Sequence, residues 1–568
     1  MPVIFRRSSL LPTLLAAVLG LVAIAAEPVR GQEAELVYAT RGPITVLDPN
    51  QMSWMQDIQV GQEIFEGVYR LDPDTPDLQP RLGAASEVEV SDDGLTWDIT
   101  IRDDARWANG DPVLASDFAF AWQRNLREWR DYSYLIASYV EGAQAYYEAY
   151  QADPASADFS TVGINVTGDK QLQVKLKYPI TFFKDLLAFT VYWPQDETAM
   201  EPFKQTADDG RVTYDAKWTN PGNISTNGPY ALRSWQPGVD LMMEMNPNYW
   251  DRDKVVSRTI KAVTNDNAGL ALEQYEAGQI DWLTDSEPDL VRNLLSQGRD
   301  DVHVFPGYGT YFLTFNCQPK LPDGRDNPFA DVRIRQALTM AIDKKPIVEN
   351  VTRLGEPTTE NYVPFVEPSF FPGYPHPYGL PHDVAAAKAL LAQAGYENGK
   401  GFPSGITYLY DTNVKTHGDV AQILAKQWKD QLGITLELEP IENAQFKQRL
   451  GSQQYALARA SWYGDYMDIS TFTDKYLSGS DNNDSKWVNL RYDELCDLAL
   501  QTNDVAERYD ALSEAEEILL TEAPILPIYH YVNFFLHRDD VTGVSQNGRK
   551  MVSMMTIGTP RSTGPGAK

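Results

Sequence analysis

Cysteine, histidine and basic residues are scarce in this sequence. Among 568 residues there are two cysteines and six scattered histidines, and no Cys/His group has the spacing of a zinc site. We therefore expect no metal and no other cofactor, and we expect Cys317 and Cys496 to stay unpaired although an oxidising compartment would allow a disulfide. Lys and Arg number 49 against 79 Asp and Glu, a net charge of −30. Nucleic acid and anionic lipid both attract basic surfaces, so neither is expected as a partner.

Enzyme motifs are missing as well. The chain has no HExxH, GxSxG or P-loop pattern, the signatures of metalloproteases, serine hydrolases and nucleotide-binding enzymes. Asp465 and Asp468 are considered as the carboxylate pair of a secreted hydrolase acting on glycans, a remote alternative. We expect a binding protein without catalytic residues. A turnover assay on peptides or glycans separates the two classes, because a binder leaves its ligand intact.

Long apolar runs are absent after the first 26 residues, and about 18 such residues are needed to cross a membrane. At the start, Arg6 and Arg7 precede an apolar run from Leu10 to Ala26 that ends in small residues. This pattern predicts a secretory signal peptide over residues 1–31. No cysteine lies near the cleavage region, so no lipid anchor is predicted there. We expect a soluble periplasmic protein.

Local patterns predict both strands and helices. Glu87–Val90 and Leu95–Arg102 flank a Ser-Asp-Asp-Gly turn, a strong hairpin signal. Ser116 is a suitable N-cap for the apolar-periodic stretch that follows it. The end of the chain, Gly558–Lys568, is rich in Gly, Pro and Ser and is predicted to be disordered.

A parallel α/β layer is predicted further along the chain. Ile406–Tyr410 has the pattern of a strand, Val420–Leu432 that of an amphipathic helix ended by Gly433, and Ile434–Leu438 alternates apolar and polar residues. Strand, helix and strand in this order suggest parallel pairing. We therefore assign the chain to the α/β class.

The next stretch carries the main candidate site. Tyr455–Trp462 is an apolar run without Pro or Gly, typical of a buried strand, and Gly464 ends it just before Asp465. Open α/β sheets bind ligands beyond the carboxyl ends of their strands. A carboxylate there, beside Trp462 and Tyr463, suits a cation such as the α-ammonium of a peptide. The alternatives are an Asp that caps the next helix or turn, and aromatic residues that belong to the core.

Three further charged residues are candidates. Arg459 lies inside the apolar run, where an unpaired charge would be costly, so it has a partner, either a structural acid or a ligand carboxylate. His417 follows a strand in a polar stretch predicted as a loop, and its alternative is an ordinary surface histidine. Asp57 is placed either at a pocket rim or at a helix cap.

Six separate motifs, in order, resemble the extracytoplasmic solute-binding proteins of bacterial ABC importers, in particular the dipeptide/oligopeptide-binding class. The resemblance extends from Leu36 to about Phe535. The motifs are IFEGVY (64–69), NGDPV with the following ASD (109–117), NGPY (227–230), NPNYW (246–250), FADVRIRQAL (329–338) and NGKGFP (398–403).

The resemblance implies a periplasmic-binding-protein fold, with two large α/β lobes joined by a hinge and a smaller third lobe. The ligand is then enclosed between the large lobes, and the protein is a monomer. The implied boundaries are signal peptide 1–31, lobe I 32–69, the smaller lobe II 70–193, lobe I again 194–308, lobe III 309–524, and a return to lobe I with a disordered tail 525–568.

The resemblance also implies the partners and the roles of the site residues. The partners are an oligopeptide and a membrane permease with its ATPase. Asp465 is then the acid that holds the α-ammonium, and Arg459 and His417 serve the C-terminal carboxylate of peptides of different length. The backbone around Ser461 and Tyr463 pairs with the peptide as an added strand. Trp462, Tyr311 and Asp57 complete the expected ligand-binding set.

Some positions depart from the family pattern. Thr314 stands near the place of an expected glutamate, an expected second arginine is shifted to Arg449, and a tryptophan expected near Asn443 is missing. Peptide length and side-chain preference therefore stay open. Two alternatives also stay open: the same fold binding nickel, haem, a sugar or an opine, and a receptor that feeds a chemosensor.

Overall fold

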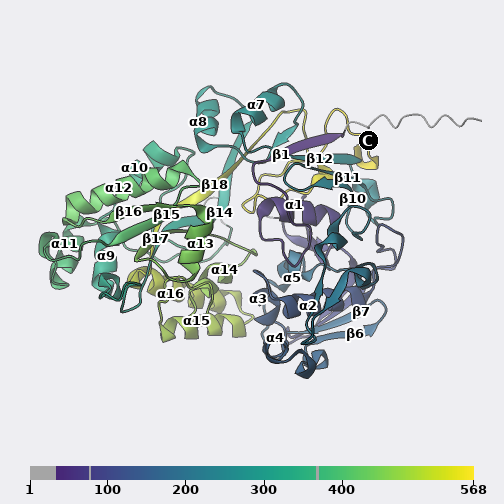
Figure 1. Ribbon diagram of the computed structural model, residues 1–568, viewed down its shortest axis with the longest axis horizontal. Helices are drawn as coiled ribbons and strands as arrows, with labels where there is room; N and C mark the ends of the chain where they lie inside the picture. The colour runs from purple at the N-terminus through teal and green to yellow at the C-terminus, as the bar shows by residue number, and fades with distance from the viewer. Residues whose placement is uncertain (1–33, 76–77, 366–369, 568) are drawn as a thin grey trace, which may run out of the picture. The chain divides into compact units, whose positions relative to one another are not determined.

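The computed structural model describes residues 34–75, 78–365 and 370–567. The predicted signal peptide lies outside these residues. The chain divides into two units, Met1–Ala34 and Glu35–Lys568, and everything below concerns the second one (Figure 1).

Eighteen strands occur in the described residues, and ten of them form one mixed sheet in the order β10-β11-β12-β1-β13-β18-β14-β17-β15-β16. Their bounds are β1 Leu36–Thr40, β2 Tyr69–Leu71, β3 Pro80–Leu82, β4 Ala85–Val90, β5 Thr96–Ile101, β6 Ile164–Gly168, β7 Gln171–Lys175, β8 Lys204–Thr206, β9 Val212–Tyr214, β10 Tyr230–Gln236, β11 Asp240–Met245, β12 Thr259–Thr264, β13 Trp282–Leu283, β14 Val302–Phe315, β15 Thr407–Asp411, β16 Glu437–Ile441, β17 Leu457–Tyr463 and β18 Ile525–His537.

Helices cover this sheet and join its strands (Figure 1). Their bounds are α1 Met55–Ile64, α2 Ala115–Glu128, α3 Tyr134–Ala137, α4 Ala143–Ala152, α5 Phe183–Leu186, α6 Glu197–Met200, α7 Ala268–Glu276, α8 Pro288–Ser296, α9 Val332–Met340, α10 Lys345–Ile347, α11 Val384–Gln393, α12 Lys415–Leu432, α13 Asn443–Gly451, α14 Ser470–Thr473, α15 Leu490–Gln501 and α16 Val505–Glu522. None of the described helices is long and apolar enough to span a bilayer.

The predicted parallel layer is confirmed. β15 and β16 pair in parallel, and α12 connects them. The predicted hairpin is confirmed too, because β4 and β5 pair antiparallel within a four-stranded sheet of order β4-β5-β7-β6. Cys317 and Cys496 are free thiols, as expected.

The Ser116 cap is wrong. Helix α2 already begins at Ala115, and Leu114 is its N-cap residue. The carboxylate of Asp117 accepts a hydrogen bond from the Leu114 backbone N–H, with an N–O distance of 2.9 Å. An acid at the third helical position therefore stabilises this end of the helix by reaching back to the cap residue.

β14 and β18 form the longest pair in the sheet. They run antiparallel from Val302 opposite Leu536 to Thr314 opposite Ile525, with a bulge where Pro306 and Thr310 face Val532 and His530. A bulge bends a strand and increases its local twist. The predicted lobe boundary after residue 308 falls inside this bulge, and the one after residue 524 falls directly before β18. The predicted lobe boundaries themselves stay a prediction.

Buried apolar side chains form several groups. One large group is drawn mostly from residues 36–282 together with Phe535 and Val541–Ile557, and we call it the first core. Two other groups are drawn from residues between Tyr308 and Tyr529. Tyr466, the residue after Asp465, belongs to the first core, although its neighbours along the chain belong to the other groups.

The disordered tail is wrong for residues 558–567. The Thr559 hydroxyl donates to the Glu35 carbonyl oxygen at 2.6 Å, the Thr563 N–H donates to the Glu35 carboxylate at 3.0 Å, and the Gly564 N–H donates to the Val256 carbonyl oxygen at 2.8 Å. The Gly, Pro and Ser content of this segment indicated disorder. Composition could not reveal its docking, because its partners Glu35 and Val256 lie hundreds of residues away in the sequence.

Deleting residues 559–568 should therefore lower stability. The buried Glu35 carboxylate would lose both bonds from Thr563 and keep the one from the Arg258 N–H. We expect a loss of about 1–3 kcal/mol, the usual cost of leaving a buried acceptor short of donors. Thermal unfolding followed by circular dichroism measures it. Thr563→Val should reproduce part of the loss, and an unchanged midpoint in both variants would contradict the docking of this segment.

Candidate functional site

Strand β17 and the turn after it carry the main candidate residues. β17 pairs antiparallel with β14 from Leu457 to Tyr463, which confirms the predicted buried strand. A Cβ atom at Gly464 would lie 2.0 Å from Cε1 of Tyr308, so the turn has room only for glycine. Asp465 follows directly, at the position where the sequence predicted a ligand-facing carboxylate.

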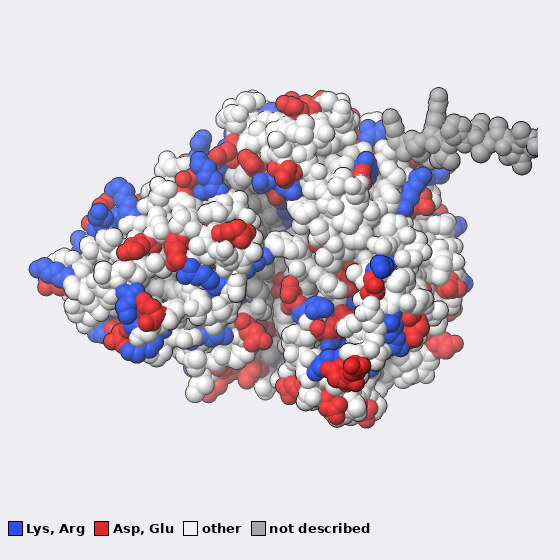
Figure 2. All heavy atoms as spheres, in the orientation of Figure 1, with Lys and Arg blue, Asp and Glu red and all other residues white. Residues whose placement is uncertain are grey.

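A cavity of about 240 Å³ opens beside Asp465, room for on the order of eight water molecules at about 30 Å³ each. It is lined by Ser53, Trp54, Asp131, Tyr132, Tyr134, Lys447, Trp462, Asp465 and Asn482. Three separate parts of the chain thus meet there. The face drawn in Figure 2 is hollowed by a groove between the part with α9–α16 and the part with α1–α5, and charges of both signs are interspersed over it.

The Asp465 carboxylate has a specific partner across this cavity. The Tyr134 hydroxyl, from α3, donates to its Oδ2 at 2.7 Å. Burial raises the pKa of Asp465 to about 6, although the Tyr134 bond and the Lys475 ammonium act in the other direction. An acid that is costly to ionise in its surroundings is a strong acceptor for an incoming cation.

Aromatic and cationic groups complete the walls. The Trp462 indole N–H donates to the Thr471 carbonyl oxygen at 2.7 Å, which fixes the ring beside Asp465. The Lys447 ammonium lies 3.8 Å from the centre of the Trp54 ring. Tyr463 is 46% exposed and stacks on Tyr531 with ring centres 4.7 Å apart. It is not among the residues that line this cavity.

A second cluster gathers Arg459, His417 and Tyr311 around an acid, Asp411. The His417 Nδ1 lies 3.0 Å and the Arg459 Nη1 3.7 Å from Asp411 Oδ2. The Arg459 guanidinium carbon lies 5.4 Å from the centre of the Tyr311 ring, and Tyr311 stacks on Tyr529 at 4.8 Å. The structure thus brings three of the predicted site residues together.

His417 does not lie in a loop. It is the third residue of α12 and is buried, because the helix starts earlier than its apolar periodicity indicated. Burial lowers the pKa of His417, against the opposing effect of Asp411. For Asp411, the bond and charge of His417 and the charge of Arg459 outweigh burial and hold its pKa below the usual value.

Asp411 was not predicted as a site residue, although the signal was present. It is the last residue of β15, which pairs in parallel with β17. Asp411 therefore lies at the carboxyl end of a buried strand, and Asp465 lies just beyond the carboxyl end of the neighbouring one. Asp411 is the structural acid that Arg459 required. At 3.7 Å the pair is loose, and the Arg459 Nε has no hydrogen-bond partner among the described residues. Buried donors are seldom left this way.

Asp57 does not reach the cavity. Its side chain is completely buried, and its Oδ1 accepts from the backbone N–H groups of Thr45 and Val46 at 2.9 and 3.3 Å. Burial raises the pKa of Asp57 to about 6, partly offset by these two bonds. The pocket-rim role is therefore wrong, because the carboxylate anchors the preceding loop inside the core.

Ser461 lies opposite Tyr311 in the β14–β17 pair. On its other side, β17 pairs with β15 only at Leu457 and Ala458. From Arg459 to Tyr463, that edge of β17 has no strand partner in the part of the chain that the structure describes. An edge of this kind accepts an added strand.

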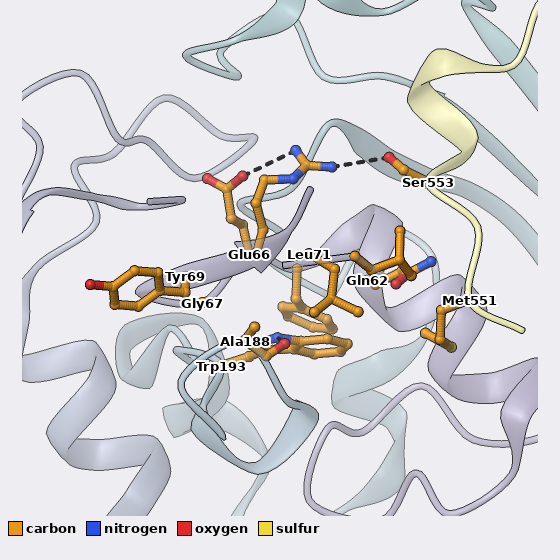
Figure 3. A pocket seen from close by; sticks show the side chains of 12 residues that line it. Gln62, Glu66, Gly67, Tyr69, Leu71, Ala188, Trp193, Met551 and Ser553 are labelled. Atoms are coloured by element: carbon orange, nitrogen blue, oxygen red, sulfur yellow. Dashed lines mark hydrogen bonds and ion pairs between the residues drawn. The ribbon is translucent and has the colours of Figure 1, made fainter. Parts of the chain in front are cut away.

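A second cavity, drawn in Figure 3, lies between α1, β2 and the segment after β18. Its volume is about 30 Å³, room for about one water molecule. Its charged group is occupied, because the Arg70 guanidinium binds Glu66 and Ser553, both at 3.2 Å. This cavity is too small for an organic ligand.

Comparison with known proteins identifies the family. Residues 78–484 match the model of the bacterial extracellular solute-binding proteins, family 5 (middle part). The oligopeptide-binding protein OppA of Bacillus subtilis is 31% identical over 503 residues, which cover 86% of each chain.

Solved structures agree. The murein tripeptide-binding protein MppA of Escherichia coli matches with a TM-score of 0.78 and 29% identity, over 94% of this chain and 99% of that one. OppA of Haemophilus influenzae in complex with RPPGFSPFR matches with a TM-score of 0.75 and 26% identity, over 93% and 99%. The predicted α/β fold class is confirmed, and the chain belongs to the bacterial extracellular solute-binding proteins of family 5.

Proposed function

We propose that this chain is the periplasmic receptor of an ABC importer. It encloses oligopeptides and delivers them to a membrane permease with its ATPase, and it has no catalytic role. The names of OppA and MppA, which specify peptide binding, support the ligand class. The arginine pair and the apolar run at the start of the chain support export. The receptor acts as a monomer.

One observation carries the proposal: the carboxylate of Asp465 beside an aromatic-walled cavity, with its pKa raised to about 6 by burial. The α-ammonium of a peptide is the cation that this site receives. An ion pair at about 4 Å is worth on the order of 4 kcal/mol at an effective dielectric constant near 20. The Tyr134 hydroxyl stays within reach of the same carboxylate and orients it.

The other end of the peptide binds toward Arg459 and His417. Arg459 and Asp465 are six residues apart on β17 and its following turn, a span of at most about 20 Å for extended chain. A peptide of a few residues fits this span. Its backbone pairs with the free edge of β17 near Ser461 and Tyr463, which gives affinity independent of side chains. The loose Arg459–Asp411 pair leaves guanidinium donors for the peptide carboxylate.

Replacing Asp465 by Asn should weaken binding of peptides with a free N-terminus by about 30-fold or more, because removing one buried charge partner costs about 2–5 kcal/mol. Peptides with an acetylated N-terminus should bind weakly to both proteins. Isothermal titration with tri-, tetra- and penta-alanine measures both.

Asp131→Asn is the matched control. Asp131 lines the same cavity but is exposed, so its loss should change affinity less than about threefold, as for other exposed charges. The ammonium role of Asp465 fails if Asp465→Asn and the parent protein bind the free peptides equally well.

The affinity for alanine peptides should depend on pH. The ammonium binds the ionised carboxylate, and the pKa of Asp465 without a peptide is about 6, so affinity should fall as the pH drops below about 6. It should also fall above about pH 8, where the peptide α-amino group loses its proton. Titrations from pH 4.5 to 9 test this, and Asp465→Asn should abolish the acidic limb. A persistent acidic limb in that variant assigns it to another group.

Arg459→Met should lower the affinity for peptides of one length class by about tenfold or more and leave the affinity for other lengths nearly unchanged. The reason is that only one peptide length places its C-terminal carboxylate at the guanidinium. Arg449→Met is the control, since that guanidinium already binds Glu439 and the Gln454 carbonyl oxygen. An equal loss at all lengths, or a lower unfolding temperature without selectivity, would make Arg459 a purely structural partner of Asp411.

A further inference from the structure

Three consecutive residues at the end of β17 contact the same distant segment, residues 134–185. Asp465 accepts from the Tyr134 hydroxyl. The Tyr466 ring stacks on Phe182, with ring centres 4.7 Å apart and planes 16° apart. The Met467 N–H donates to Asp185 Oδ2 at 2.7 Å. These three contacts tie the turn that carries Asp465 to α3 and α5.

The Asp185 carboxylate is a charged group in this set of contacts. While its Oδ2 accepts from Met467, its Oδ1 accepts from the Arg549 Nη2 at 2.6 Å. The Asp185 and Arg549 side chains are only 6% and 10% exposed. Arg549 comes from the segment after β18, so one carboxylate joins three parts of the chain. A buried, charge-assisted contact of this kind is short and directional.

The opposite side of the turn is also fixed. The Asp465 N–H donates to the Thr471 hydroxyl at 3.0 Å, and the Tyr308 hydroxyl donates to the carbonyl oxygens of Tyr466 and Asp468 at 3.1 and 2.9 Å. The backbone N–H of Met467 is anchored by a carboxylate from another part of the chain, Asp185. Loss of that anchor frees the peptide unit between Tyr466 and Met467, next to Asp465.

We propose that Asp185 and Arg549 are positioning residues for Asp465: they hold the Asp465 turn against α3 and α5, and so keep its carboxylate beside Tyr134 and the cavity. Neither residue is among those that line the cavity, and both are proposed to act on Asp465 through the turn. The inference rests on the proposed ammonium role of Asp465. It differs from that role because it concerns residues that act through the turn.

The test uses the ratio of affinities for a peptide with a free N-terminus and its N-acetyl form, measured with tri-, tetra- and penta-alanine on the full mature chain. Asp185→Asn and Arg549→Met should each lower this ratio by about 3- to 10-fold, an effect in the lower part of the range of coupling between neighbouring residues in one network. Arg549→Lys, which keeps a charged donor, should restore most of it.

Asp48→Asn is the matched control for stability. Asp48 and Arg124 form another buried Asp–Arg pair, 2.6 Å apart. This variant should lower the unfolding temperature and leave the ratio unchanged, because a purely structural loss affects both peptide forms alike.

Two outcomes overturn the inference in distinguishable ways. If Asp465→Asn removes the preference for the free N-terminus while Asp185→Asn and Arg549→Met keep it, the positioning role is wrong and the proposed function stands. If Asp465→Asn itself keeps the preference, the ammonium role fails and the positioning role fails with it.

Discussion

The antiparallel pair of β14 and β18 joins the two halves of the ten-stranded sheet, with β13 on one side and β17 on the other. These two long strands lie at the middle of the ten-stranded sheet and contribute to buried groups on both sides of it. The bulge between Pro306 and Thr310 contains Tyr308, whose ring excludes a side chain at residue 464. The bulge that bends this pair therefore also shapes the turn of Asp465.

The candidate site owes its chemistry to local burial, and the net charge of −30 does not determine it. At one end, Asp465 is partly withdrawn from water and faces a tyrosine hydroxyl. At the other, Arg459 and His417 share Asp411 in a buried aromatic cluster. β17 and the turn after it thus present a cation, Arg459, and a carboxylate, Asp465, and the backbone edge between them has no strand partner in the described part of the chain. This polarity matches an extended zwitterion, and each charge interacts strongly because the surroundings are poorly polarisable.

The turn after β17 combines two tasks. It carries the candidate ligand-binding carboxylate, and through Tyr466 and Met467 it is also built into the packing of residues 134–185. The carboxylate proposed to bind the ligand and the contacts with residues 134–185 therefore belong to the same short stretch of backbone. The aromatic stack and the buried Asp185–Arg549 pair restrict where Asp465 lies, and such restriction reduces the ordering cost of binding.

The α/β class, the family resemblance, the hairpin, the parallel layer and the acid after the buried strand could all be predicted from the sequence, because they rest on periodicity and on motifs of residues close together in the chain. It misplaced the start of α2 by one residue, because Asp117 reaches back to Leu114 and so allows the helix to begin at Ala115. It also gave no reliable account of Asp57, whose burial depends on the packed core, or of the last ten residues, whose partner Glu35 lies more than 500 residues away in the chain. Tertiary structure alone decided that Tyr134 faces Asp465, that Asp411 pairs with Arg459, and that Asp185 joins three segments. The physical reason is that a buried polar group must find its partner in space, and in this chain those partners lie up to several hundred residues away.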